Sequence, residues 1–155
     1  MHDLYWNTVD PNLRVVLVNL MAEQIFDPFR LVGGTALSLQ LGHRKSVDID
    51  LFTDMPYGSI DFDAIDTYFR QHYPYVSDPI AAPVAFGRSY FVGDDPQNAI
   101  KVDIYYTDPF IRKPILADDI RMASTEEITA MKIDVIGRRG RKKDFWDIHE
   151  LLETV

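Results

Sequence analysis

The spacing of apolar residues predicts three helices in the first half of the chain. After Asp10-Pro11-Asn12, which resembles a helix start, apolar residues recur at helical spacing over residues 13–25. A short helix is expected over residues 35–41, directly after two glycines. A longer one is expected over residues 62–73, because Pro74 cannot continue it.

Two further helices are predicted near the end of the chain. Ser124-Thr125-Glu126-Glu127 has the pattern of a capping box and opens a helix that runs to Ile136, with Gly137 as its expected stop. A basic linker over residues 138–143 leads to a last helix over residues 144–153. We expect this helix to turn its apolar residues inward, namely Phe145, Ile148, Leu151 and Leu152.

Runs of β-branched and aromatic residues between Gly, Asp and Pro clusters predict the strands. They lie at residues 29–32, 47–52, 85–92, 99–106 and 121–123. Residues 93–98 are expected to join the third and fourth strands as an antiparallel hairpin, and the last strand is expected at a sheet edge. Strands and helices mixed in this way indicate an α/β (α+β) fold, in which a small mixed β-sheet is flanked by helices.

Composition limits the classes of protein that fit. The 155 residues are 46% hydrophobic and 12% aromatic, which suits one domain over residues 1–155 with a substantial core. The formal net charge of -8 argues against a surface devoted to nucleic acid, so any contact with a polyanion should be local. The absence of cysteine excludes disulfides and thiolate metal sites. With no signal-like start and no long apolar run, we expect a cytoplasmic protein without a membrane partner.

The most informative chemistry lies in Val47-Asp48-Ile49-Asp50-Leu51. Successive side chains of a strand point to opposite faces, so Asp48 and Asp50 share one face while the aliphatic residues pack on the core. Two like charges near a core are costly, and a cation would relieve them. Asp103 repeats the pattern on another strand. The sequence therefore predicts a site for Mg²⁺, or Mn²⁺, held by three carboxylates and by substrate phosphates.

The turn Gly33-Gly34-Thr35 stands upstream of the acidic strand, where a strand is expected to run into a helix. Backbone amides at a helix start lack partners and favour phosphate. Arg44 and Ser46 precede the acidic pair closely enough to reach a phosphate or to order the start of the strand. A plain surface role for Arg44 remains an equal alternative.

These residues resemble a known family. The stretch from Gly33-Gly34-Thr35-Ala36-Leu37 to His43-Arg44-Lys45-Ser46-Val47-Asp48-Ile49-Asp50-Leu51-Phe52 is similar to the first motif of the AbiEii/AbiGii-type nucleotidyltransferase toxins. That family belongs to the DNA-polymerase-β-like nucleotidyltransferase superfamily. Lys132 and Lys143-Asp144-Phe145-Trp146-Asp147-Ile148 resemble its later signatures, so the matches span residues 29–152.

The resemblance implies a nucleotidyltransferase fold in which the two late helices close over an NTP. Asp48, Asp50 and Asp103 would be the catalytic and metal-binding residues, and Asp103 would also help to deprotonate the acceptor hydroxyl. Asp144 would support the site from the last helix. The nucleotide-binding candidates are Gly33, Gly34, Thr35, Arg44, Ser46 and Lys132.

Several of these residues have a structural alternative. Lys132 shares a helical stripe with apolar residues, so either it touches phosphate or its ammonium group reaches out from the edge of the stripe. We favour a structural role for His43, because no partner pattern accompanies it. Asp94-Asp95 and Asp118-Asp119 are expected in solvated turns.

The acceptor is less well defined than the nucleotide. The basic linker is a candidate RNA contact through Arg138, Arg139, Arg141, Lys142 and Lys143. The resemblance suggests NMP transfer from an NTP to an RNA or tRNA end, by the toxin of a toxin–antitoxin pair with a cognate antitoxin protein. Transfer to an aminoglycoside-like small molecule or to a protein side chain stays open, as does a degenerate domain that binds a nucleotide or a partner without turnover.

Overall fold

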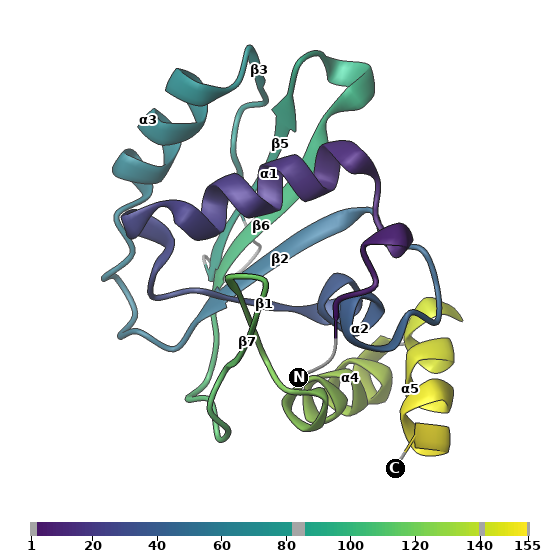
Figure 1. Ribbon diagram of the computed structural model, residues 1–155. Helices are drawn as coiled ribbons and strands as arrows, with labels where there is room; N and C mark the ends of the chain where they lie inside the picture. The colour runs from purple at the N-terminus through teal and green to yellow at the C-terminus, as the bar shows by residue number, and fades with distance from the viewer. Residues whose placement is uncertain (1–2, 82–85, 140–141, 155) are drawn as a thin grey trace.

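The computed structural model in Figure 1 describes residues 3–81, 86–139 and 142–154. The helices are α1 (Pro11–Ala22), α2 (Gly33–Leu41), α3 (Phe62–His72), α4 (Thr125–Arg139) and α5 (Lys142–Thr154). The strands are β1 (Arg30–Val32), β2 (Asp48–Thr53), β3 (Tyr75–Val76), β4 (Ile80–Ala81), β5 (Gly87–Gly93), β6 (Ile100–Tyr106), β7 (Ile115–Ala117) and β8 (Ile120–Met122). Short 3₁₀ turns lie at Trp6–Thr8, Gln24–Phe26 and Pro96–Asn98.

The strands form one mixed sheet. Their order is β3-β5-β6-β2-β1-β8-β7, and β4 also pairs with β5. β2 runs parallel to β6, and β1 runs parallel to β8, whereas the other pairs are antiparallel. This sheet and its flanking helices confirm the predicted fold class.

The main core lies between the sheet and the helices α1 and α3 (Figure 1). Leu13, Leu17 and Leu20 of α1 are fully buried, and each such side chain contributes about 1.5–3 kcal/mol of hydrophobic stabilisation. On α3, the ring of Phe69 lies 4.9 Å from that of Tyr90 on β5. Separately, α4 and α5 pack on each other and on α2, next to β1 and β2. The second face of β2 and β6 therefore lies outside the main core.

The predicted hairpin is confirmed as β5 and β6, although residues 82–85 lie outside the described part of the chain. The edge position predicted for residues 121–123 is wrong, because β8 lies between β1 and β7. Asp118 and Asp119 form the two-residue turn that joins β7 to β8, and both have positive φ, 49° and 61°. This turn agrees with the prediction for that pair, and β7 escaped notice because the stretch before it is rich in Pro.

The late helices differ from the prediction at their boundaries. α4 runs through Gly137 to Arg139, and α5 already begins at Lys142. A glycine inside a helix costs only about 1 kcal/mol, so it need not end one. The predicted basic linker is therefore largely helical, and Arg141 lies outside the described residues.

The expected orientation of α5 is partly wrong. Leu151 is buried and Ile148 is half-buried, but Phe145 and Leu152 are 55% and 72% exposed. The helix instead turns a stripe that includes the fully buried Asp147 toward the protein. Buried ion pairs, rather than the largest apolar side chains, set the rotation of this helix.

Candidate active site

Three neighbouring strands carry polar side chains on the sheet face that lies away from α1. Burial alternates along β2 and β6, so Asp48, Asp50 and Asp103 point to this face while the residues between them point to the core. In the parallel register of β2 and β6, Asp50 stands opposite Asp103. Asp103 in turn stands opposite Ser89 of β5. The fold thus brings two of the predicted carboxylates side by side, with Asp48 one step along β2.

Asp50 is the electrostatic centre of this face. Burial, the charge and hydrogen bond of Asp103, and the charge of Asp48 raise the pKa of Asp50 to about 8, and the charge of Lys143 opposes this shift. Asp103 is held by the Ser89 hydroxyl, which donates to its Oδ1 at 2.6 Å. Such a crowded carboxylate pair is relieved either by a proton or by a cation.

The glycine turn approaches this carboxylate directly. Gly33 begins α2 with a φ of +71°, and a Cβ on it would lie 2.5 Å from Oδ2 of Asp50. A Cβ on Gly34 would lie 2.1 Å from Nη2 of Arg44. Glycine is needed at both positions because the backbone itself touches a side chain. The start of α2 therefore lies next to Asp50.

We expect Gly33→Ala to lower the free energy of unfolding by about 2–4 kcal/mol, since a left-handed backbone and a clash with the carboxylate of Asp50 each cost about 1–3 kcal/mol. Urea denaturation measures this loss. Gly58→Ala is the matched control, because Gly58 has a φ of +87° but no atom within 4 Å of its Cβ position. Equal losses in the two variants would contradict the close approach of Gly33 to Asp50.

Thr35 and Ser46 serve the frame of the site through their hydroxyls. Both residues are buried, and their hydroxyl oxygens lie 2.6 Å apart. The Thr35 hydroxyl also donates to the backbone oxygen of Asp48. These contacts tie the start of α2 to the start of β2. The turn reaches the main cavity through Gly33 and Gly34.

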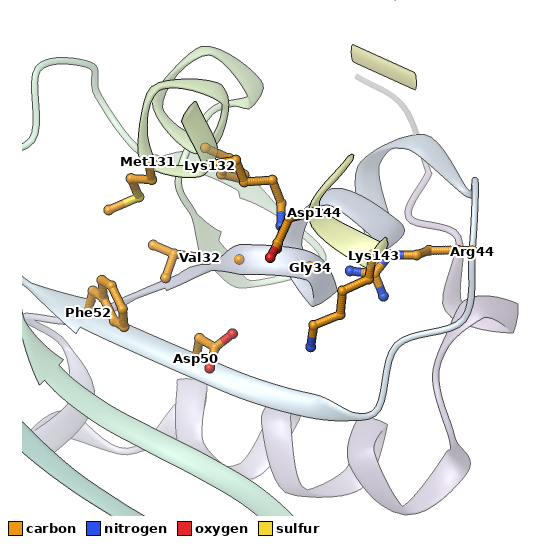
Figure 2. A pocket seen from close by; sticks show the side chains of 11 residues that line it. Val32, Gly34, Arg44, Asp50, Phe52, Met131, Lys132, Lys143 and Asp144 are labelled. Atoms are coloured by element: carbon orange, nitrogen blue, oxygen red, sulfur yellow. The ribbon is translucent and has the colours of Figure 1, made fainter. Parts of the chain in front are cut away.

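A cavity of about 220 Å³ opens between β2, α4 and α5 (Figure 2). One part of its wall is apolar and consists of Val32, Phe52, Ile128 and Met131. The other part is polar and consists of Gly33, Gly34, Arg44, Asp50, Lys132, Lys143 and Asp144. Figure 2 shows Lys143 reaching from α5 toward Asp50 on β2. A second cavity of about 90 Å³, which adjoins the first and shares Asp50 and Lys143 with it, extends toward Asp48.

Three cationic or titratable side chains contact Asp147 of α5 behind the polar wall of the main cavity. Arg44 binds it through Nε at 2.8 Å and Nη2 at 2.9 Å, Lys132 binds it at 2.7 Å, and Nε2 of His43 also contacts it. Burial alone would raise the pKa of Asp147, but hydrogen bonds from His43, Arg44 and Lys132 outweigh it and hold the pKa well below its usual range. Sequence reasoning did not single out Asp147. The available signal was its spacing of three residues from Asp144, which puts both on one face of a helix.

The contacts with Asp147 decide between the alternative roles given above for Lys132 and Arg44. Lys132 is 6% exposed and also binds Asp144 at 3.0 Å, so the alternative in which its ammonium group reaches out to solvent is wrong. Arg44 is not a plain surface cation, because Nε and Nη2 along one edge of its guanidinium group both donate to Asp147. His43 contacts Asp147 through Nε2, and its structural role stays a prediction. Lys132 and Arg44 thus line the cavity while they are anchored from behind.

Residues 15–154 match the family described as "Nucleotidyl transferase AbiEii toxin, Type IV TA system". The chain belongs to the AbiEii family. A relative from Aquifex aeolicus (strain VF5), an uncharacterized protein called aq_aa25, is 32% identical over 145 residues. The match covers 90% of this chain and 65% of that relative, so the chain spans about two thirds of the relative's length.

Solved structures agree with the AbiEii assignment at the level of the fold. A candidate nucleotidyltransferase from H. pylori has a TM-score of 0.64 at 23% identity, covering 93% of this chain and 69% of that one. The Megavirus polyadenylate synthase has a TM-score of 0.62 at 19% identity, covering 90% of this chain and 31% of that one. The chain therefore has the nucleotidyltransferase fold predicted from its motifs. Within the residues described, no helix is both long and apolar enough to cross a bilayer.

Proposed function

We propose that this AbiEii family member is a metal-dependent nucleotidyltransferase that moves an NMP from an NTP to an acceptor hydroxyl and releases pyrophosphate. One observation carries the proposal: Asp50, which stands opposite Asp103 on the neighbouring strand, lies against a glycine turn at a helix start. Carboxylates there suit a divalent cation, and the amides of the turn suit phosphates. A purely structural role would not explain why two acids are kept together at a cavity.

The donor set fits Mg²⁺, and the same oxygens suit Mn²⁺. In the described part of the chain, no three Asp, Glu, His or Cys side chains form a preformed metal cluster. Mg²⁺ is usually bound by one or two carboxylates together with substrate phosphates. We assign Asp50 and Asp103 as the main ligands and Asp48 as the third. The bound ion would supply positive charge to the transferring phosphates.

The polar and apolar parts of the cavity wall suit different parts of a nucleotide. Its polar wall, with the turn at Gly33 and Gly34 and the cation of Lys143, would receive the triphosphate. Its apolar wall, with Val32 and Met131, would receive the base and sugar. The ammonium group of Lys132 would bind the phosphates, and the ion pair with Asp144 would orient that ammonium group.

Incubation with labelled NTPs, Mg²⁺ and total RNA tests the proposed reaction. The wild type should transfer label to RNA, and Asp48→Ala should abolish the transfer. Asp63→Ala is the control, because Asp63 is an exposed acid on α3 and should transfer label like the wild type. An absence of label on RNA, protein and small-molecule acceptors at saturating NTP would refute the transferase proposal.

Lys143→Met should weaken NTP binding about tenfold, because a charge-assisted hydrogen bond to phosphate contributes about 1.5–3 kcal/mol. Isothermal titration calorimetry in the presence of Mg²⁺ measures the dissociation constant. Lys142→Met is the matched control, since Lys142 is the exposed neighbour and does not line either cavity at this site. If both variants lost affinity equally, the general charge of α5 would be responsible rather than Lys143.

We propose an RNA end, such as that of a tRNA, as the acceptor, and a cognate antitoxin protein as a partner. The family's description as a toxin of a type IV toxin–antitoxin system supports the second point. Lys142 and Lys143 begin α5 beside the cavity, where they would meet an RNA backbone, while the side chains of Arg138, Arg139 and Arg141 lie outside the described residues. Growth inhibition by the wild type, relieved by Asp48→Ala, would support the toxin role.

A further inference from the structure

We propose that Tyr105, together with Lys101, forms the subsite for the terminal nucleoside of the acceptor RNA. The proposal rests on the proposed function, because it concerns the acceptor of the same reaction. Nine residues share one face of the sheet here and form a grid, three each from β2, β6 and β5. Its rows are Asp48, Lys101 and Phe91; Asp50, Asp103 and Ser89; and Phe52, Tyr105 and Gly87.

Tyr105 is held in place beside the catalytic carboxylates. Its hydroxyl lies 3.3 Å from the hydroxyl of Ser89, which itself donates to Asp103. At the other end of the side chain, Gly87 lies against Tyr105: a Cβ on Gly87 would lie 2.1 Å from the backbone oxygen of Ile104 and 2.8 Å from Cγ of Tyr105, so no side chain fits between the two strands here. The ring is therefore a fixed feature of this face rather than a mobile surface side chain.

The aromatic surface is continuous with the nucleotide cavity. The rings of Phe52 and Tyr105 stack at 5.9 Å between centroids with 23° between their planes, and Phe52 also lines the cavity. Asp103 and Tyr105 lie two positions apart on one strand, which is about 7 Å. A ribose bridges such a gap, so a nucleoside stacked at Tyr105 would bring its terminal hydroxyl to Asp103.

Among residues 3–81, 86–139 and 142–154, nothing closes this face to a ligand. Phe91, Lys101, Tyr105 and Phe52 are all half-buried. Among the described elements, α4 and α5 pack on each other and on α2, whereas the helices α1 and α3 belong to the core on the opposite face. This end of β5 and β6 thus offers aromatic surface next to the site without a helix from the described residues over it.

The chemistry of the face favours a nucleic acid end over a cationic small molecule. Aromatic rings stack on any nucleobase, and a lysine beside them attracts the preceding phosphate. Lys101 is 39% exposed in its side chain and lies 3.8 Å from Asp103, so it partly cancels the negative charge that an aminoglycoside-like cation would need. A single-stranded RNA 3′ end satisfies the ring, the cation and the carboxylate together.

The test measures binding of a short single-stranded oligoribonucleotide with a 5′ fluorophore and a free 3′ hydroxyl, by fluorescence anisotropy. Tyr105→Leu should raise the Kd about tenfold, whereas Tyr105→Phe, which keeps the ring, should change it by less than about twofold. Tyr57→Leu is the matched control, because Tyr57 is a 66% exposed tyrosine that packs on Tyr106 outside the grid. It should bind RNA like the wild type.

The possible results separate this inference from the proposed function. Transfer to RNA with the same KM for RNA in Tyr105→Leu as in the wild type would overturn the subsite alone. Ring-dependent RNA binding without transfer to any acceptor would overturn the transferase proposal but keep the subsite. If Tyr105→Leu fails to fold, Tyr105→Trp replaces it and should bind RNA at least as tightly as the wild type; weaker binding would count against stacking.

Discussion

Asp50→Asn is expected to lower the rate of nucleotide transfer by about a thousandfold or more, because it removes the negative charge that would hold the metal ion, and the metal ion would neutralise the phosphates. The amide has nearly the same shape as the carboxylate and can keep its contact with Asp103. The loss should therefore appear in kcat and in Mg²⁺-dependent NTP binding, without unfolding. Measurement of both quantities checks the result.

The same substitution should stabilise the protein in the absence of metal. The pKa of Asp50 is raised from 3.8 to about 8 in the folded state, so ionisation of Asp50 opposes folding. Below pH 4 the carboxyl is protonated in both states and the effect is absent. As the pH rises from about 4 to about 8, the wild type loses stability that the uncharged amide retains.

Thermal denaturation across this pH range, with and without Mg²⁺, distinguishes the two effects. Without metal, Asp50→Asn should melt above the wild type at pH 8 and close to it at pH 4. With Mg²⁺, the wild type should gain stability that the variant does not gain. A variant that is less stable than the wild type at every pH would mean that Asp50 has a structural partner rather than a cation.

The acidic residues of β2 in this candidate site could be predicted from the sequence, because the pattern that marks them lies within a few neighbouring residues. The alternation around Asp48 and Asp50 fixes their face as soon as the segment is a strand, and the glycine turn precedes it directly. Asp103 was recognised as similar, but its place opposite Asp50 depends on the parallel pairing of β2 and β6. That pairing joins strands about fifty residues apart and has no local signature.

The cationic residues of the site could not be placed from the sequence, because their contacts form only in the folded chain. Arg44 and Lys132 carry charges whose direction the sequence does not encode, and both are turned to the buried Asp147. The rotation of α5 follows from the same contacts, which is why the exposed Phe145 was expected inside. An amphipathic pattern predicts burial of apolar residues, but it fails where a buried acid outweighs them.

Asp147→Ala should therefore be among the most destabilising single substitutions in the chain. It would remove the carboxylate that binds Arg44 and would leave the buried Lys132 with Asp144 as its remaining acidic partner. Loss of one partner from a buried ion pair costs about 3–5 kcal/mol. Since both cations line the cavity, NTP binding should weaken as well. Urea denaturation and calorimetric titration measure the two effects.

Asp66→Ala is the matched control, because Asp66 also binds an arginine, Arg70, at 2.8 Å but on the exposed face of α3. A pair open to solvent contributes little, so this variant should unfold like the wild type. The pKa of Asp147 is held low, so its stabilising effect should persist above about pH 4 and fade as the pH falls further. Equal stability of the two alanine variants at neutral pH would mean that the contacts of Asp147 do not hold α5 against the site.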